Sequence, residues 1–158
     1  MKTISLDKPK SQPRLNYPQF APATLQGMLA LSDIVKHSGL EESLLHLVDI
    51  RASQINGCAL CLEMHIRAAK GAGETDDRIN LLSAWREIDL YTERERAALQ
   101  WAELLTRLAD GHVTDEDFAA VSAEFTEAEL ANLSLAIVAI NGWNRLNVGF
   151  KVPPGFAG

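Results

Sequence analysis

The feature that most constrains the fold of this sequence is the spacing of its apolar residues, which recur every three or four positions along most of the chain. A side chain that returns at this interval stays on one face of an α-helix, whereas a half-buried strand needs strict alternation. Two such stretches run from Ala23 to about Gly39 and from Glu41 to Gln54. Strand-like alternation of any length is absent from the sequence. The pattern predicts an all-α fold.

Local signals place the boundaries of the remaining helices. Asn56 and Gly57 are small, conformationally permissive residues that end the second helix, and a third helix then runs from Cys58 to about Lys70. A threonine hydroxyl can accept a hydrogen bond from the unpaired N–H groups of a helix start. This signature occurs at Thr92-x-x-Glu95, Thr114-x-x-Asp117 and Thr126-x-x-Glu129.

One further helix completes the expected set. Thr75 can cap a helix whose buried side carries Ile79, Leu81, Leu82 and Trp85. Residues 141–150 are expected to continue the last helix or to follow it closely, until Pro153 and Pro154 stop it. The chain is therefore expected to have about seven helices, with the two cysteines at the N-terminus of the third.

The first 22 residues differ from the rest of the chain. Pro9, Pro13 and Pro18 punctuate this polar stretch, and proline disfavours helix in the residue before it and removes a backbone donor. We therefore predict an extended N-terminal arm over residues 1–22 that lies across a neighbouring surface. Residues 23–158 are predicted to form a single all-helical domain, since 158 residues are about the size of one domain.

The composition argues against two classes of partner. The formal net charge is −6, and no run rich in lysine or arginine offsets it, so phosphate backbones are repelled. The longest apolar run, Leu135–Ile140, is far shorter than the roughly 20 residues of a membrane helix. Residues 1–20 lack the apolar stretch of a secretory signal. We therefore expect a cytoplasmic protein that binds neither nucleic acid nor membrane.

The chain has only two cysteines, Cys58 and Cys61, and they stand three residues apart. A disulfide over so short a loop cannot brace a fold, so in a reducing compartment the spacing indicates redox chemistry or metal binding. On a helix, Cys58, Cys61 and His65 share one face. Two thiols and an imidazole are therefore expected to converge near the start of the third helix.

Thiol chemistry needs such neighbours, because only the thiolate attacks a peroxide oxygen or a disulfide sulfur and an ordinary cysteine is mostly protonated near neutral pH. The positive end of the helix dipole favours a thiolate at Cys58 or Cys61, and His65 can serve as base or proton shuttle. His46, one helix earlier, is a second candidate base. Once one sulfur is oxidised to a sulfenic acid, the other can condense with it before over-oxidation.

A longer motif surrounds the cysteine pair. It reads Arg51-x-Ser53-Gln54-Ile55-Asn56-Gly57-Cys58-x-x-Cys61-x-x-x-His65, and is followed by Gly73-Glu74-Thr75, Ala84-Trp85-Arg86-Glu87 and Ile140-Asn141-x-Trp143-Asn144-Arg145. With these residues the chain resembles the alkylhydroperoxidase D (AhpD) group of the carboxymuconolactone decarboxylase family, most strongly over residues 41–87. The resemblance implies an all-helical subunit that assembles into trimers or hexamers. It also implies peroxidase or disulfide-reductase activity supported by a thiol electron donor.

The resemblance further implies roles for single residues. In that family the second cysteine, which is Cys61 here, forms the sulfenic acid, and the first, Cys58, is the proton donor and resolving partner. His65 matches the relay histidine. His46 stands where the family has a relay glutamate, and since a histidine has no fixed negative charge at neutral pH, Glu42 one turn earlier is the group that could supply one.

We therefore predict a thiol-dependent, antioxidant peroxidase that reduces hydroperoxides through a CxxC dithiol/disulfide cycle and needs no metal or cofactor. Its partners would be the hydroperoxide substrate, a thiol or disulfide electron donor and further copies of the chain. The predicted catalytic residues are Cys58, Cys61, His65 and His46.

Other interpretations stay open. The protein could be a disulfide reductase or redox adaptor for a partner peroxiredoxin, or a non-enzymatic redox sensor. Cys58, Cys61, His65 and His46 also have suitable donor types for a zinc site, the cysteines could be simply buried apolar residues, and His46 could be a packed helix residue. Decarboxylation fits least, because a lactone decarboxylase has no evident use for a dithiol. The remaining two histidines are expected at the surface, and the three tryptophans in packing positions.

Overall fold

The computed structural model describes residues 11–156, which contain eight α-helices, two 3-10 helices and no strand. The all-α prediction is therefore confirmed. In chain order the elements are α1 (Tyr17–Phe20), α2 (Pro22–Lys36), α3 (Glu42–Asn56), α4 (Ala59–Gly71), α5 (Asp76–Asn80), η1 (Leu82–Glu87), α6 (Glu93–Thr106), η2 (Leu108–Asp110), α7 (Asp115–Ser122) and α8 (Glu127–Gly149).

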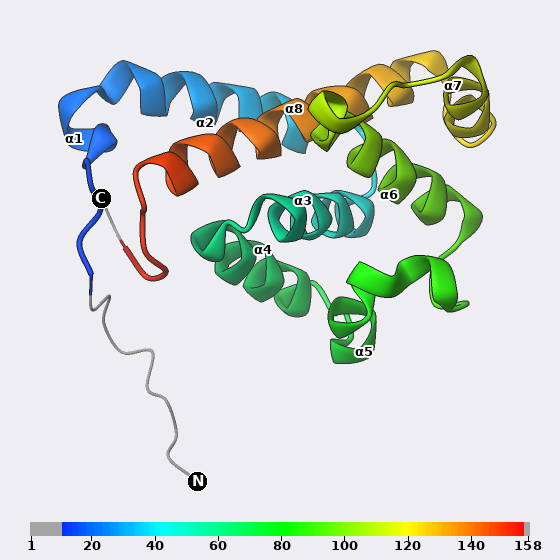
Figure 1. Ribbon diagram of the computed structural model, residues 1–158, viewed down its shortest axis with the longest axis horizontal. Coiled ribbons are helices and arrows are strands. Elements are labelled where there is room, and N and C mark those ends of the chain that lie inside the picture. Colours follow the sequence, from blue (N-terminus) through cyan, green and yellow to red (C-terminus); the bar gives the residue numbers. More distant parts are fainter. Residues whose placement is uncertain (1–10, 157–158) are drawn as a thin grey trace, which may run out of the picture.

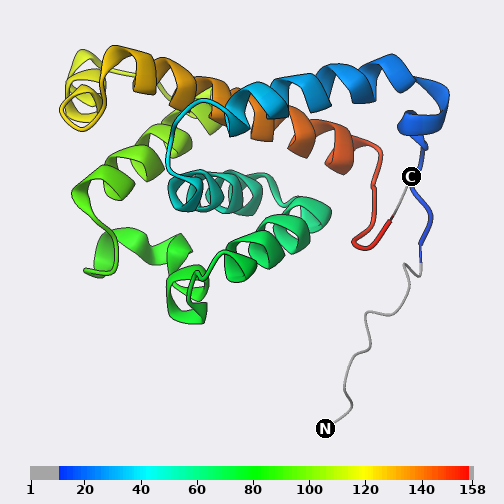
Figure 2. The same cartoon turned by 180° about the vertical axis from the view of Figure 1, so that it is seen from behind.

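Helix α3 lies at the centre of the molecule and packs against α4, α6 and α8 (Figure 1). Its apolar residues Leu47, Val48 and Ile50 are fully buried, and each such side chain contributes about 1.5–3 kcal/mol relative to exposure. Helix α2 runs along the outer side of α8, as both views show (Figures 1 and 2). All 15 residues of α2 are described and none of them is buried.

The predicted helix starts are confirmed in detail. Reciprocal capping boxes occur at α6, α7 and α8, where the threonines at 92, 114 and 126 and the acidic residues three positions later each hold the other's backbone N–H. The Thr75 hydroxyl accepts from the Arg78 N–H at 3.3 Å and caps α5. Gly57, with φ of 66°, ends α3 in the left-handed conformation that glycine adopts at little cost. These signals are local, which is why sequence alone reveals them.

Two expectations differ from the structure. Residues 17–20, inside the segment expected to be extended, form the one-turn helix α1, because Pro18 in a first turn removes only an N–H that has no helical partner anyway. Residues 1–10 of the predicted arm lie outside the described residues. Leu81, expected on a buried face, is 42% exposed, because α5 ends at Asn80 and the chain turns there into η1.

A buried ion-pair network ties α3, η1 and α6 together around Glu103. The Arg51 Nε and the Trp85 Nε1 donate to Glu103 Oε1 at 2.7 and 2.9 Å, and Arg86 Nη1 donates to Oε2 at 2.7 Å. The Glu103 side chain is only 9% exposed. Because every charge in the network has a partner, burial does not leave an isolated ion.

Within residues 11–156, every helix is too short or too polar to cross a lipid bilayer.

Candidate functional site

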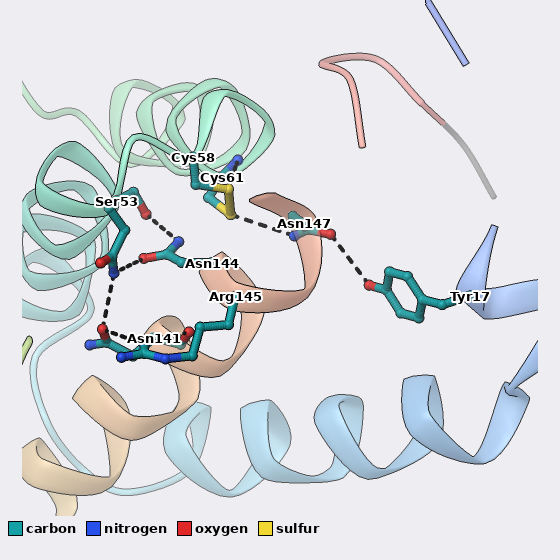
Figure 3. Close-up of a disulfide and its surroundings, with 9 residues drawn as sticks. Tyr17, Ser53, Cys58, Cys61, Asn141, Asn144, Arg145 and Asn147 are labelled. Atoms are coloured by element: carbon teal, nitrogen blue, oxygen red, sulfur yellow. Dashed lines mark hydrogen bonds between the residues drawn. A yellow bond between two sulfur atoms is a disulfide. The ribbon is translucent and has the colours of Figure 1, made fainter. Parts of the chain in front are cut away.

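The two cysteines lie at the start of α4, where they form a disulfide with a Cα–Cα distance of 5.3 Å (Figure 3). Cys58 is the N-cap residue, and its sulfur accepts a hydrogen bond from the Cys61 N–H at 3.3 Å. Both residues are almost fully buried and pack against Ala52 of α3 and Ile140 of α8. The structure thus shows the oxidised state of a dithiol whose first sulfur receives an N–H of the helix start.

A second donor reaches the other sulfur from α8. Asn147 Nδ2 lies 3.5 Å from Cys61 Sγ, and the Tyr17 hydroxyl of α1 donates to Asn147 Oδ1 at 3.4 Å (Figure 3). Tyr17 and Asn147 are 5% and 7% exposed. A chain of two hydrogen bonds therefore links α1, α8 and the sulfur of Cys61.

Further amides on α8 hold α3 in place beside the disulfide. Asn56 Nδ2, at the end of α3, donates to Asn141 Oδ1 at 3.0 Å and to Asn144 Oδ1 at 2.9 Å. Asn144 Nδ2 donates in turn to Ser53 Oγ at 3.0 Å, and Arg145 Nη1 donates to Asn141 Oδ1 at 2.9 Å. Buried polar groups are costly unless paired, so this asparagine network fixes the position of the turn that carries Cys58.

A cavity of about 660 Å³ opens beside the disulfide, between α2, α3, α4 and α8. Cys61 lines the cavity and Cys58 does not. Most of the wall is apolar and comes from all four helices, with Leu25, Leu29, Val35, Leu45, Leu60, Met64, Ala139, Ile140 and Trp143 among its residues. A volume in this range is typical of small-molecule sites, and a molecule in the cavity would lie beside Cys61.

Ionisable side chains from α3 and α4 line the same cavity near Cys61. His65 Nδ1 lies 3.3 Å from Asp49 Oδ2, and these side chains are 25% and 21% exposed. His46 Nε2 lies 3.6 Å from Glu42 Oε1, and within residues 11–156 this buried nitrogen has no hydrogen-bond partner. Glu42 itself is 79% exposed. The cavity therefore combines an apolar body with two imidazoles and two carboxyl groups.

Burial changes the acid–base behaviour of this group. It raises the pKa of Asp49 to about 8, because a charged carboxylate is poorly solvated there. Burial, and secondarily the nearby His46, lowers the pKa of His65 to about 4. Both shifts act against charge, so at neutral pH the neutral forms of Asp49 and His65 are favoured.

The structure brings the four residues predicted to be catalytic to one place: Cys58 and Cys61 form the disulfide, and His65 and His46 line the adjoining cavity with Cys61. Sequence reasoning missed Asp49, Asn147 and Tyr17. The signal for Asp49 was its place one turn after His46, and the signal for Asn147 was the spacing of Asn141, Asn144 and Asn147 at every third position of the last helix.

The structure also gives the positions of the other histidines and of the tryptophans. His37 and His112 are exposed, and Trp85 and Trp101 are buried. Trp143 lines the cavity and donates to Ser32 Oγ at 2.8 Å. Among residues 11–156, no three His, Cys, Asp or Glu side chains come together in an arrangement that could hold a metal ion, so the geometry gives the zinc hypothesis no support.

Comparisons with known proteins identify the family and the fold of this chain. The model of the Carboxymuconolactone decarboxylase family matches residues 22–104. The uncharacterized protein YdfG of Bacillus subtilis (strain 168) is 37% identical over 135 residues, which make up 85% of this chain and 92% of YdfG.

Solved structures show the same fold. The crystal structure of ATU0492 from Agrobacterium tumefaciens, a protein of unknown function suggested to be the antioxidant defence protein AhpD, has a TM-score of 0.88 and 40% sequence identity over 92% of this chain and 100% of that one. The debrominase Bmp8 has a TM-score of 0.77 and 18% identity over 86% of this chain and 73% of its own, and at this identity shows the fold alone. The chain therefore belongs to the carboxymuconolactone decarboxylase family and has the AhpD-like helical fold.

Proposed function

We propose that this protein is a thiol-dependent peroxidase that reduces organic hydroperoxides through a Cys58–Cys61 dithiol/disulfide cycle and serves in antioxidant defence. The observation that carries the proposal is the asymmetry of the disulfide: Cys61 opens on an apolar cavity beside two histidines, whereas Cys58 is enclosed behind it. A substrate in the cavity would meet one sulfur only, and the second sulfur would be one helical turn away.

In the oxidative half of the cycle, the Cys61 thiolate attacks the terminal oxygen of the hydroperoxide. The O–O bond breaks, the sulfur becomes a sulfenic acid, and the released alkoxide takes up one proton to become an alcohol. The Cys58 thiol then attacks the Cys61 sulfenic acid and expels water, which gives the disulfide. Asn147 Nδ2, 3.5 Å from Cys61 Sγ, is placed to stabilise negative charge on the attacking sulfur.

In the reductive half, a donor thiolate attacks the accessible sulfur, Cys61, and forms a mixed disulfide while Cys58 leaves as a thiolate. The N–H of Cys61, which already points at Cys58 Sγ at 3.3 Å, would stabilise this leaving group, and a stable leaving thiolate accelerates exchange. A second donor thiol then releases Cys61. One hydroperoxide and two donor thiols thus give one alcohol, one water and one donor disulfide.

The cavity supports a preference for substrates with an apolar body. Hydrogen peroxide can interact only with the polar side chains of the cavity. A hydroperoxide with an aromatic or branched alkyl group also buries apolar surface against the apolar wall, which contributes about 25 cal/mol of binding free energy per Å². Organic hydroperoxides should therefore have the higher kcat/KM.

The test is hydroperoxide consumption with cumene hydroperoxide and hydrogen peroxide, in the presence of dithiothreitol, by the wild type, Cys58→Ser and Cys61→Ser. The wild type should turn over with cumene hydroperoxide preferred. Cys61→Ser should be inactive, and Cys58→Ser should stop at a sulfenic acid that dimedone traps and mass spectrometry locates on Cys61. If dimedone traps as little sulfenic acid in Cys58→Ser as in Cys61→Ser, Cys61 is not the sulfur that attacks the hydroperoxide and the assigned roles of the two cysteines are wrong.

The same cavity leaves room for a second function. A wild type without turnover in dithiothreitol that regains it with a partner peroxiredoxin would be a redox adaptor. A wild type that does not consume hydroperoxides but removes bromide from 2,3,4-tribromopyrrole, the compound bound in a structure of the debrominase Bmp8, would instead be a debrominase.

We also propose that the protein works as a homo-oligomer, a trimer or a hexamer. Helix α2 carries no buried residue, and the large apolar side chains of Phe20, Leu29 and Ile34 are 71%, 47% and 57% exposed. Apolar surface of this kind on the adjacent helices α1 and α2 favours contact with a second copy of the chain.

A further inference from the structure

The chain contains two pairs of an aspartate and a histidine in very different surroundings. Asp49 and His65 face each other across α3 and α4 with Oδ2 and Nδ1 3.3 Å apart, and their side chains are 21% and 25% exposed. Asp33 and His37 form a similar pair on α2, with Oδ1 and Nδ1 3.4 Å apart, but their side chains are 72% and 69% exposed. Only the first pair lines the cavity that contains Cys61.

The contact with Asp49 decides what the other nitrogen of His65 can do. A carboxylate at Nδ1 accepts that nitrogen's proton and leaves Nε2 as a proton acceptor, whereas a protonated carboxyl donates to Nδ1 and leaves Nε2 as a proton donor. His65 follows Cys61 by one turn of α4, on the same face. The Nε2 atom is therefore the one available to the chemistry at Cys61.

We propose that Asp49 is a positioning residue that acts through His65, holding the Nδ1 edge of the ring and exchanging a proton with it, so that Nε2 first accepts a proton from the Cys61 thiol and later donates one to the oxygen released from the hydroperoxide. This role rests on the proposed peroxidase function. It adds to that function a group that stores the proton between the two steps.

The proton balance of the cycle closes within this pair. When the Cys61 thiol gives its proton to Nε2, the Nδ1 proton moves to the Asp49 carboxylate, so the imidazole stays neutral. When the Cys61 thiolate has attacked and the O–O bond has broken, the alkoxide takes the proton from Nε2 and Nδ1 recovers its own from Asp49. No imidazolium forms in either step, which suits a site where burial disfavours charge.

Burial sets the pH range in which the pair can accept the thiol proton. Because burial raises the pKa of Asp49 to about 8 and lowers that of His65 to about 4, Asp49 carries a proton below about pH 8. The carboxylate that takes up the Nδ1 proton in the first step therefore forms as pH rises through about 8. The other titratable or charged side chains lining the cavity are Tyr17 of α1, Lys36 of α2, Glu42 and His46 of α3, and Cys61 of α4. The α8 residues of the lining carry no titratable group.

The experiment measures the protonation of the Asp49–His65 pair and, separately, the reactivity of Cys61. Protein labelled with ¹⁵N-histidine is titrated from pH 5 to 10 by NMR in the reduced wild type, in Asp49→Asn, in Asp49→Glu and in the matched control Asp33→Asn. In parallel, each substitution is combined with Cys58→Ser, and the rates of Cys61 oxidation by cumene hydroperoxide and of Cys61 alkylation by iodoacetamide are measured over the same pH range.

We expect the His65 nitrogen resonances to shift near pH 8 in the wild type and Asp33→Asn, and to lose this shift in Asp49→Asn. The oxidation rate in Asp49→Asn should fall on the order of 10- to 100-fold, below the full contribution of a general acid–base group. It should also lose the increase near pH 8 that ionisation of Asp49 produces, and Asp49→Glu should recover part of the rate. His65 resonances that simply follow those of exposed His37, or an oxidation rate unchanged in Asp49→Asn, would overturn the proposal.

Failure of the peroxidase function itself has a different signature. In that case hydroperoxide leaves Cys61 unoxidised in the protein with native Asp49. The rate of Cys61 alkylation then tests the role of Asp49 by itself. If the pH profile of this rate changes in Asp49→Asn and not in Asp33→Asn, Asp49 controls the Cys61 proton, and identical profiles refute that role.

Discussion

Replacing Asn147 by leucine tests whether the amide that contacts Cys61 stabilises the thiolate. The substitution keeps a side chain of similar size in a position that is 7% exposed but removes the only donor that α8 offers to Cys61 Sγ within the described residues. A hydrogen bond to a charged group contributes about 1.5–3 kcal/mol. The 3.5 Å separation places this one at the lower end, and about 1.5 kcal/mol is roughly a tenfold change in an equilibrium.

The expected result is a thiolate population at Cys61 about tenfold smaller near pH 7, and therefore alkylation by iodoacetamide about tenfold slower. The measurement uses the reduced Cys58→Ser background, so that one thiol reacts, and each rate is divided by its plateau at high pH. That normalisation separates thiolate population from access through the cavity.

Tyr17→Phe is the matched control. It removes the hydroxyl that donates to Asn147 Oδ1 at 3.4 Å but keeps the Asn147 donor to sulfur, so alkylation should slow by less than about threefold, as expected for an indirect effect of under about 0.7 kcal/mol. Near-UV circular dichroism of both variants verifies that the helices still pack. If Asn147→Leu alkylates at the parental normalised rate, the contact does not stabilise the thiolate and the reasoning fails.

Three further predictions concern stability and assembly. Glu103→Ala should lower the free energy of unfolding in urea by about 3–5 kcal/mol, because it leaves Arg51, 11% exposed, without its carboxylate; a loss below 1 kcal/mol would show that the network is not needed. Burial opposes ionisation of Glu103, yet hydrogen bonds from Trp85, Arg86 and Arg51 lower its pKa below the ordinary value. Ionised Glu103 therefore stabilises the folded protein fully above the ordinary pKa of a glutamate, and this stabilisation is lost as pH falls through the lower pKa of the folded state. Glu103→Gln should accordingly reduce the difference in free energy of unfolding between pH 7 and pH 3. Light scattering should give a molar mass three or six times 17.3 kDa, and a monomer would count against the α2 interface.

Much of the fold could be predicted from sequence because its determinants are local. Each capping box lies within four residues, and apolar spacing marks α2, α3 and α4 without knowledge of their neighbours. The one-turn helix α1 was not predicted, because Pro18 suppresses helix as a rule but is tolerated in a first turn.

The candidate site could be predicted only where its residues share a helix or a short turn. Cys58, Cys61 and His65 lie on α4, so their convergence follows from helical geometry. The contact between Asp49 and His65 depends on how α3 folds back on α4, and the Tyr17–Asn147 hydrogen bond joins residues 130 positions apart. Neither these contacts nor the cavity has a local signal that fixes it.

The asparagine network on α8 has a consequence for how the redox centre responds to its surroundings. Amides do not titrate, and Arg145, its only charged member, keeps its charge at any physiological pH. The wall behind the sulfur pair is therefore chemically the same in acid and in alkali, while the opposite wall, with its histidines and carboxyl groups, changes. A change of pH would therefore alter the reactivity of the sulfurs through the groups on the cavity side, without loosening the turn that holds them.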